Sequence, residues 1–187
     1  MSKINYSIIP INSLIDSECL NSFTCGNEEE ENRINNFLKQ DAIAYDLRGI
    51  TKTFLYVRDR EVVGFFSLCT SETKVTRNFR TNKLSGNTLK CRAEPSLYPS
   101  IELTYFAIKL SEQKKKLGTS MMHDILELLY FQVYRHVGFV MVTLESRSAA
   151  KEFYTKMGFD YHKTKSGNDN LMALTITDIE TILGIDY

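Results

Sequence analysis

Three consecutive lysines stand just before a glycine in the segment SEQKKKLGTSMM, residues 111–122. The residues before Gly118 are polar and those after it are apolar at helical spacing, so we expect a helix to begin here. The free N–H groups and the positive dipole end of a helix N-terminus favour a phosphate. Gln113 to Thr119 therefore form a candidate phosphate-binding loop. The alternative is a solvated loop, which is the commoner role of a lysine run.

The segments around this loop predict a strand, a helix and a second strand in succession. Residues 100–110, SIELTYFAIKL, are rich in β-branched and aromatic side chains, and residues 138–145, GFVMVTLE, are a nearly continuous apolar run typical of a central strand. A largely buried helix is expected between them. Its apolar face comprises Met121, Met122, Ile125, Leu128, Leu129 and Val133. This unit favours one mixed α/β domain over residues 1–187 rather than two domains.

The N-terminal part predicts a short first strand, INYSII, and then an amphipathic helix from about Glu28 to Tyr45. Asn27 is a suitable N-cap for that helix, and Glu30 lies three residues later, as a capping box requires. The acidic residues of the first turn suit the positive end of the helix dipole.

A hairpin and a polar stretch follow. Two β-rich runs on either side of Asp59-Arg60 predict the hairpin. Residues 71–98 match no clean period and are expected to be a loop with at most short elements. Their basic residues form either a substrate-facing patch or a solvated excursion, and the latter is the more frequent case. These residues are Lys74, Arg77, Arg80, Lys83, Lys90 and Arg92.

The C-terminal part predicts a short helix and two closing strands. The helix, SRSAAKEFYTKMGF, has Ser148 as a plausible N-cap and Gly158 as its stop. The strands are DYHKTK at 160–165 and LMALTIT at 171–177, joined through the turn residues SGNDN. Residues 178–183, DIETIL, are expected to form a terminal helical turn.

Two segments of the chain resemble motifs of the GNAT N-acetyltransferase superfamily. In that family a strand ends in a small hydrophobic triplet, and a Gln/Arg-x-x-Gly-x-Gly/Ala loop follows. The triplet here is Phe106-Ala107-Ile108, and the loop is Gln113-Lys114-Lys115-Lys116-Leu117-Gly118. The family's Ala-x-x-x-Tyr-x-x-x-Gly-Phe helix is matched by Ala150, Tyr154, Gly158 and Phe159. The resemblance covers nearly the whole chain. It implies the GNAT acyl-CoA N-acyltransferase fold, a mixed sheet of about six to seven strands with flanking helices.

The resemblance implies transfer of an acetyl group from acetyl-CoA to a primary amine. The phosphates of coenzyme A would lie on Gln113 to Thr119, beside the three lysines. Backbone N–H groups of Phe106 to Ile108 would bind the pantetheine and polarise the thioester carbonyl. The strands at 101–109 and 138–145 are expected to splay apart, and the pantetheine arm would enter the gap like an added strand.

Residue roles follow from the same resemblance. Tyr154 matches the tyrosine that protonates the leaving thiolate, although an aromatic in such a short helix is otherwise a packing residue. Glu102 lies five residues before Ala107, at the spacing of the catalytic base in the histone-acetylating branch, and Glu145 is a rival for that role. Arg147 occupies the position of an asparagine that often touches the cofactor. The other departure is in the loop, where Lys114 and Lys116 replace glycines.

The N-terminal half is similar to a GNAT branch that contains acetyltransferase toxins of toxin–antitoxin systems. The similarity includes Phe23, Cys25, Gly26, the Phe37-Leu38 pair and the run at 64–66. Three hypotheses remain: an N-acetyltransferase of unknown amine specificity, a toxin that acetylates the α-amine of aminoacyl-tRNA, and a degenerate non-catalytic domain that binds CoA or a partner. A homodimer and an antitoxin partner are implied by the family.

Composition limits the partners. Lys plus Arg and Asp plus Glu number 23 each, so a protein that coats long nucleic acid is disfavoured and any anion site must be local. The four cysteines form no CxxC pair and lie far from the three histidines, so we expect reduced thiols and no metal. No apolar run approaches about 20 residues and no secretory signal is visible, so a cytoplasmic protein without membrane segments is expected.

Overall fold

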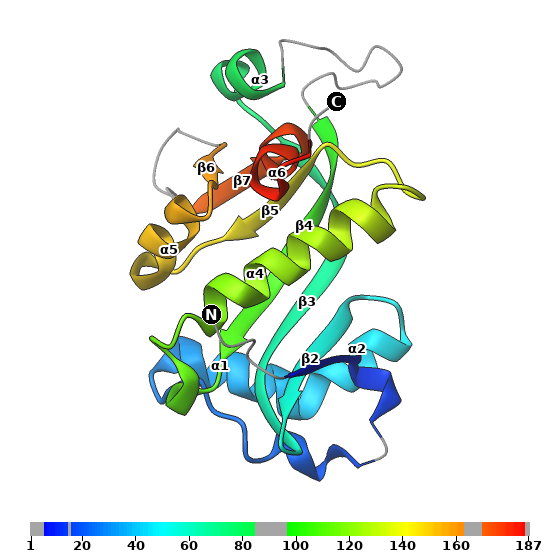
Figure 1. Cartoon of the computed structure of the whole chain (residues 1–187), viewed down its shortest axis with the longest axis vertical. Helices are drawn as coiled ribbons and strands as arrows, with labels where there is room; N and C mark the ends of the chain where they lie inside the picture. The colour runs from blue at the N-terminus through cyan, green and yellow to red at the C-terminus, as the bar shows by residue number, and fades with distance from the viewer. Residues whose placement is uncertain (1–5, 15, 85–96, 163–169, 186–187) are drawn as a thin grey trace. The chain divides into compact units, whose positions relative to one another are not determined.

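The computed structural model describes residues 6–14, 16–84, 97–162 and 170–185 (Figure 1). The strands form a seven-stranded mixed sheet in the order β1-β2-β3-β4-β5-β7-β6. Helices flank the sheet, and the expected mixed α/β fold is confirmed. The strands are β1 (Ser7–Pro10), β2 (Lys52–Arg58), β3 (Glu61–Lys74), β4 (Leu97–Ile108), β5 (Met141–Glu145), β6 (Asp160–Tyr161) and β7 (Leu171–Thr175).

The helical segments alternate with these strands. The α-helices are α1 (Glu29–Asn36), α2 (Ala42–Leu47), α3 (Arg77–Lys83), α4 (Leu117–Leu128), α5 (Lys151–Lys156) and α6 (Ile176–Leu183). Two π-helical turns, η3 (Phe37–Asp41) and η5 (Leu129–Val133), continue α1 and α4, and short 3-10 turns are η1 (Ile11–Ser13), η2 (Ser17–Leu20), η4 (Leu110–Glu112) and η6 (Ser148–Ala150). None of the helices in the described ranges has both the length and the apolar character needed to cross a membrane.

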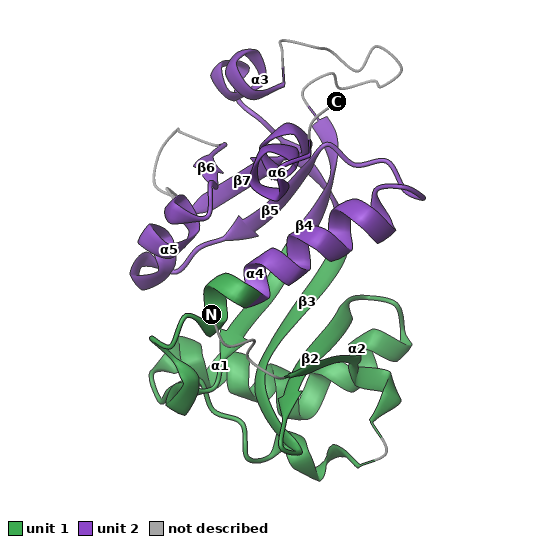
Figure 2. Cartoon of the chain, in the orientation of Figure 1, with its two compact units in different colours: residues 1–69, 103–120 green, residues 70–102, 121–187 purple. Residues whose placement is uncertain are grey.

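The chain divides into two compact units, each with its own core (Figure 2). The first comprises residues 1–69 and 103–120, and the second residues 70–102 and 121–187. The prediction of one domain over the full length stays a prediction, and the units are described separately.

The first unit is built on the antiparallel strands β1, β2 and β3. The predicted hairpin is confirmed, because Asp59 and Arg60 separate β2 from β3 with φ angles of 52° and 65°. Positive φ at both central residues is the pattern of a type I′ turn, whose twist matches that of the strands. Side chains from the N-terminal segment, the helices and the hairpin pack into one core. Its fully buried members include Ile11, Phe23, Leu38, Leu55 and Phe65.

The helix predicted from Glu28 to Tyr45 is a continuous helical run with the π turn η3 in its middle. The prediction that Asn27 and Glu30 cap this helix is wrong, because the capping pair lies one residue later, at Glu28 and Glu31. The backbone N–H of Glu28 donates to the Glu31 carboxylate at 3.1 Å, while the Asn27 carbonyl accepts from Asn32 at 3.0 Å. In η3, the ring of Phe37 is buried and stacks on Tyr105 of β4, with 3.7 Å between ring centroids.

The second unit is centred on β5, which is nearly all buried, as its apolar sequence predicts. Its neighbours are β4 in parallel, through Ser100–Glu102 against Met141–Thr143, and β7 in antiparallel orientation. The predicted apolar face of α4 is mostly confirmed. Met121, Met122, Ile125 and Leu129 are fully buried, whereas Leu128 and Val133 are half-buried and Leu126 takes a buried position that the helical pattern missed.

Three C-terminal boundaries differ from the sequence prediction. Ser148 lies inside the 3-10 turn η6 and makes no capping bond, so its assignment as N-cap of the helix is wrong. Gly158 does end that helix, with φ of 92°. β7 stops at Thr175, whose hydroxyl accepts from the N–H of Asp178 at 3.2 Å and starts α6. The terminal turn is therefore an eight-residue helix. Most of the SGNDN turn lies outside the described residues.

The polar stretch at 71–98 contains the end of β3, the helix α3 and the start of β4. Thr76 caps α3, since its hydroxyl accepts from the N–H of Phe79 at 3.2 Å. Lys83 of the expected basic patch binds Asp160 at 2.7 Å and Asp178 at 3.2 Å, and these carboxylates raise the pKa of Lys83. Lys90 and Arg92 lie outside the described residues.

Candidate active site

The candidate phosphate-binding loop connects β4 with α4 in the first unit (Figure 1). The end of β4 is fixed by two backbone bonds, from Lys109 N–H to Val63 at 2.9 Å and from Leu110 N–H to Thr24 at 2.8 Å. The first backbone bond of α4 joins Ser120 N–H to the Lys116 carbonyl at 3.2 Å. Helix geometry then leaves the N–H groups of Leu117, Gly118 and Thr119 without a partner inside the helix. These groups are suited to bind an anion.

Two lysines of the loop have a backbone conformation that normally belongs to glycine. Lys114 and Lys116 have φ angles of 62° and 66°. An L-residue in this left-handed region costs about 1–2 kcal/mol because its Cβ approaches the backbone. A loop whose glycines are replaced by lysines has therefore kept the path that glycine would give it. Left-handed residues are a feature of the backbone concavities that bind anions in proteins.

The side chains of the three lysines differ in their partners. Lys115 binds the Glu112 carboxylate at 3.3 Å, and the same carboxylate receives Arg58 at 2.8 Å. The Arg58 guanidinium, with help from Lys115, holds the pKa of the Glu112 carboxyl below its ordinary value. Lys114 and Lys116 are exposed, and neither makes an ion pair within the described part of the chain. Their positive charge is thus available to a ligand.

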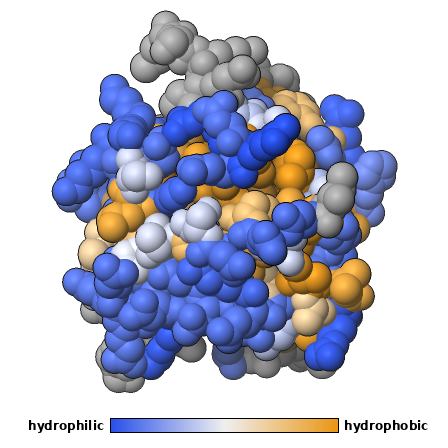
Figure 3. Space-filling model, turned by 90° about the horizontal axis from the view of Figure 1, so that it is seen from below, coloured by the Kyte–Doolittle hydropathy of each residue, from blue (hydrophilic) through white to orange (hydrophobic). Residues whose placement is uncertain are grey.

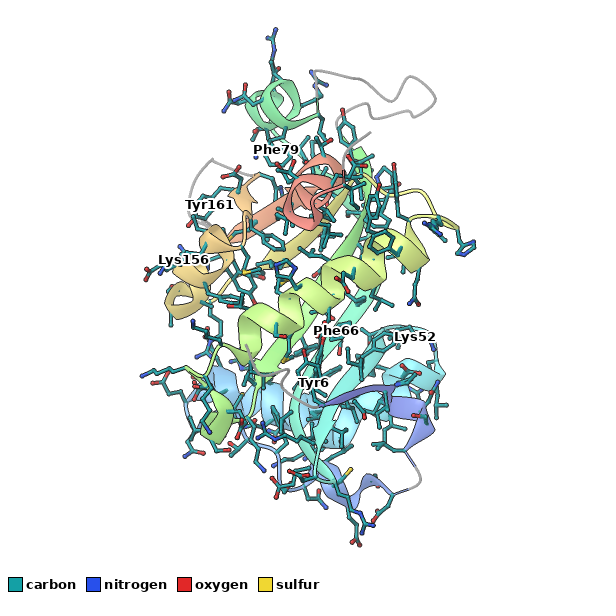
Figure 4. The ribbon with its side chains drawn as sticks, viewed as in Figure 1. Tyr6, Lys52, Phe66, Phe79, Lys156 and Tyr161 are labelled. Carbon is teal, nitrogen blue, oxygen red and sulfur yellow. The ribbon has the colours of Figure 1, made fainter. Side chains whose placement is uncertain are left out.

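Gln113 anchors the start of the loop. Its side-chain amide donates to the carbonyl of Cys25 at 2.7 Å and to the carbonyl of Ile108 at 3.2 Å. The second bond ties the loop to the end of β4, and the first ties it to a segment 88 residues away in sequence. A further contact lies at the other end of the loop, where the hydroxyl of Tyr6 (Figure 4) is 2.8 Å from that of Ser120.

The residues of β4 alternate between the two faces of the sheet as a strand requires. Phe106 and Ile108 are half-buried, whereas Ala107 is buried in the core of the first unit. Glu102, in the second unit, is half-buried and lies opposite Thr143 of β5 in the parallel register. Its rival Glu145, the last residue of β5, is exposed. Glu102 is therefore the less exposed of the two carboxylates.

Tyr154 lies in the second unit on the buried face of α5, with 8% of its surface exposed. Its ring meets Phe153 at 5.2 Å and Phe159 at 5.8 Å between centroids. Burial raises the pKa of the Tyr154 phenol well above its ordinary value, and the nearby positive charge of Arg147 opposes that shift in part. The phenol is therefore protonated at neutral pH. On the exposed face of α5, Lys156 (Figure 4) binds Glu152 at 2.6 Å.

No protein-family model matches the chain. Solved structures resemble it over almost its full length. AtaT complexed with acetyl-methionyl-tRNAfMet has a TM-score of 0.78 and 21% identity, covering 96% of this chain and 99% of that one. A tyrosine-to-phenylalanine variant of KacT has a TM-score of 0.76 and 20% identity, with coverage of 95% and 98%. A third structure is a tyrosine-to-phenylalanine variant of the toxin AtaT bound to the C-terminus of the antitoxin AtaR. It has a TM-score of 0.74 and 21% identity, covering 98% of this chain and 99% of that one.

The chain has the GNAT fold. In this GNAT fold the candidate site residues fall into two sets. The first unit brings together the end of β4 and the loop, linked through Gln113. The second unit brings Arg147 near Tyr154 and holds Glu102. Among the described residues, no cluster of three or more His, Cys, Asp or Glu side chains could hold a metal.

Asn35 is a residue of this GNAT fold that the sequence reasoning missed. It is a buried polar side chain in α1, between Ile34 and the buried pair Phe37-Leu38. A polar residue on an otherwise apolar helix face is a signal that was readable in the sequence. Its partners, however, lie in the segment at 24–26, and this pairing requires the structure.

Proposed function

We propose that this chain is an acetyl-CoA-dependent N-acetyltransferase. The observation that carries the proposal is the glycine-like backbone of Lys114 and Lys116 in the loop before α4, in a chain with the GNAT fold. The left-handed backbone of this loop costs free energy and lies beside the charges of Lys114 and Lys116. Such strained conformations are found mainly at functional sites, where they serve the binding of a ligand. Solvation alone would not require such a conformation.

The loop is the proposed seat of the phosphates of coenzyme A. The N–H groups of Leu117, Gly118 and Thr119 would donate to the pyrophosphate, aided by the positive end of the α4 dipole. Lys114 and Lys116 would add charge on either side, and Lys115 would join them at the expense of its pair with Glu112. Gln113 keeps the loop at the end of β4. Arg147 is a further proposed cofactor contact.

The reaction forms one C–N bond and breaks one C–S bond. The neutral amine attacks the thioester carbon, and backbone N–H groups of Phe106, Ala107 and Ile108 stabilise the negative oxygen that develops. The amine proton passes to a base, for which we propose Glu102 because Glu145 is exposed. The thiolate of coenzyme A leaves and receives a proton from Tyr154, whose burial keeps the phenol protonated. Net products are an acetylated amine and free thiol, and exchange with solvent takes the proton from Glu102 and restores the one that Tyr154 gave up.

A tyrosine-to-phenylalanine substitution is the change that tests the Tyr154 assignment. The similar structures include tyrosine-to-phenylalanine variants of both AtaT and KacT. AtaT has also been solved with acetyl-CoA. Removing only the hydroxyl of a tyrosine is the substitution that separates proton donation from packing, so it is the one we choose for Tyr154.

A second candidate function is acetylation of aminoacyl-tRNA by a toxin. The observation that favours it is the complex of AtaT with acetyl-methionyl-tRNAfMet. Partners proposed with it are an antitoxin, since AtaT is solved with the C-terminus of the antitoxin AtaR, and a second copy of the chain. The charge distribution weakens this candidate, because Lys83 of the expected basic patch is already bound to two carboxylates. The cytoplasm is the proposed location for either activity.

A third candidate is a non-catalytic domain that binds CoA or a partner. A thermal-shift experiment with acetyl-CoA separates CoA-binding proteins from the rest, because a ligand of the native state raises stability by mass action. An acetyl-transfer screen against small amines, peptides and charged tRNA then distinguishes the three. Transfer to charged tRNA alone selects the toxin, transfer to other amines selects the general enzyme, and stabilisation without any transfer selects the non-catalytic domain.

A further inference from the structure

We propose that Asn35 is a positioning residue for the cofactor loop, and that it acts through the segment Thr24-Cys25-Gly26. The inference rests on the proposed function, since it assigns the phosphates of acetyl-CoA to that loop. All residues involved belong to the first unit. The observation behind it is that one short segment is bonded to Asn35 on one side and to the loop on the other.

On the side of α1, Asn35 holds the segment with three hydrogen bonds. Its carbonyl oxygen accepts from the N–H of Cys25 at 2.9 Å. Its amide group donates to the carbonyl of Gly26 at 2.9 Å and to the hydroxyl of Thr24 at 3.3 Å. Asn35 is only 6% exposed, so water cannot replace these bonds when they are lost.

On the side of the loop, the segment offers two carbonyl oxygens. The Thr24 carbonyl accepts from the N–H of Leu110 at 2.8 Å, at the beginning of the connection from β4 to α4. The Cys25 carbonyl accepts from the side chain of Gln113 at 2.7 Å. The N–H and the C=O of one residue, Cys25, therefore join Asn35 to the first residue of the phosphate-binding loop.

The segment has little freedom to move away from α1. Gly26 has φ of 152°, and a Cβ at this position would lie 1.8 Å from the Glu31 carboxylate oxygen. The glycine thus allows the segment to lie directly on the first turn of α1. A segment fixed on one side transmits its position to the other, because the bonds to Leu110 and Gln113 are short and directed. Without Asn35, the segment at 24–26 loses the hydrogen bonds that fix it on α1, and the phosphate-binding loop loses a fixed attachment point.

The inference is tested first on the ligand-free protein by amide hydrogen exchange. Asn35→Ala is compared with Asn32→Ala, which removes an exposed asparagine of the same helix bonded to Asn27. The informative amide is that of Leu110, which Asn35 does not touch. We expect its exchange to rise at least tenfold in Asn35→Ala and to stay unchanged in Asn32→Ala. The Lys109 amide, bonded to Val63, should not change in either variant.

The second test measures affinity. Dissociation constants are compared for CoA, which has phosphates, and for acetyl-pantetheine, which has none. We expect Asn35→Ala to weaken CoA at least tenfold and acetyl-pantetheine less than twofold. Gln113→Leu should weaken CoA binding by a similar factor. The CoA dissociation constant of the double variant should lie within threefold of that of the weaker-binding single variant, because both substitutions break the same connection. Should Asn35→Ala fail to fold, Asn35→Ser carries both tests, because it keeps a polar group at this position but is too short to hold Thr24, Cys25 and Gly26 together.

Three outcomes would overturn the proposal. The first is unchanged exchange of the Leu110 amide in Asn35→Ala. The second is an equal rise in the dissociation constants of CoA and acetyl-pantetheine. The third is a double variant whose loss of CoA affinity equals the product of the losses in Asn35→Ala and Gln113→Leu. If the wild-type protein does not bind CoA, the proposed function fails. The exchange experiment still decides whether Asn35 positions the loop, so the two failures are distinguishable.

Discussion

Lys114 and Lys116 share a left-handed backbone conformation, with φ angles of 62° and 66°, on either side of Lys115, whose φ is negative. The loop therefore follows a glycine-like path with side chains that carry positive charge. Strain and charge make separate contributions, and substitutions can separate them.

Replacing Lys116 by glycine should give a more stable protein than replacing it by alanine. Both changes remove the charge, but only glycine occupies the left-handed region without the cost of about 1–2 kcal/mol. At an ordinary helical position the order is reversed, because glycine is less favourable than alanine by about 0.5–1 kcal/mol. Urea unfolding of the two variants measures the difference. The same pair at Lys115 is the control, and an alanine variant at least as stable as the glycine variant at position 116 would contradict the strain.

Neutralising the loop lysines should weaken CoA binding in a salt-dependent way. Lys114→Gln and Lys116→Gln are each expected to raise the dissociation constant about fivefold at low salt, which corresponds to about 1 kcal/mol for one charge near a phosphate in water. The effect should shrink as added salt screens the charges. Lys115→Gln should have a smaller effect because Glu112 already holds that lysine. Titration calorimetry at two salt concentrations tests this, and equal effects for all three lysines would exclude the distinction.

Alkaline pH should destabilise the protein partly through Tyr154. Burial raises the pKa of this phenol in the folded state above the unfolded value of about 10. The unfolded chain therefore loses the proton first, so the contribution is complete below about pH 10 and falls as pH rises, by about 1.4 kcal/mol per pH unit. Burial also raises the pKa of Tyr105, which adds to the loss.

The measurement is the free energy of unfolding between about pH 9 and 11 for the wild type and Tyr154→Phe. The variant should lose less stability over this range than the wild type. Tyr161→Phe, which removes the hydroxyl of a tyrosine with 40% exposure (Figure 4), is the matched control. Parallel curves for the wild type and Tyr154→Phe would show that Tyr154 is not shielded from solvent.

Glu102 and Glu145 can be distinguished as bases by their pH–rate profiles. Glu102→Gln should lower kcat/KM by about 10²-fold or more near neutral pH, because removing a general base costs that much. The loss should diminish at high pH, where the amine is neutral without help. Glu145→Gln is the matched control and should leave the profile unchanged. A large loss in Glu145→Gln with none in Glu102→Gln would reverse the assignment.

The sequence predicts the order of strands and helices well, because periodicity is a local property. The nearly continuous apolar run at 138–145 predicts a central strand, and the β-rich runs around Asp59 and Arg60 predict a hairpin; the structure has both. The ends of helices are harder to predict, because several adjacent residues can supply the acceptor that caps the first N–H groups of a helix. The sequence pattern placed the cap at Asn27 with Glu30, whereas the structure uses Glu28 with Glu31.

The site was predictable only in part. The motif identified the loop and Tyr154, but it gave no way to know that Lys114 and Lys116 would keep the left-handed backbone. The connection from Asn35 to Gln113 joins residues 78 positions apart through a third segment, and no local pattern encodes it. Surface properties are also set by the fold. Leu47 and Ile50 are exposed although both are hydrophobic. The face of the molecule in Figure 3 has hydrophobic areas among hydrophilic ones.

The most direct test is acetyl transfer by the wild type and Tyr154→Phe, measured as release of free CoA thiol with an amine, peptide or charged-tRNA acceptor. The acetyl-CoA dissociation constant is measured alongside. We predict transfer by the wild type, and in Tyr154→Phe a kcat lower by about 10²–10⁴-fold with unchanged affinity, as expected for loss of a proton donor. Equal rates for the two proteins would contradict the role of Tyr154. A wild type that neither binds acetyl-CoA nor acetylates any acceptor would contradict the account as a whole.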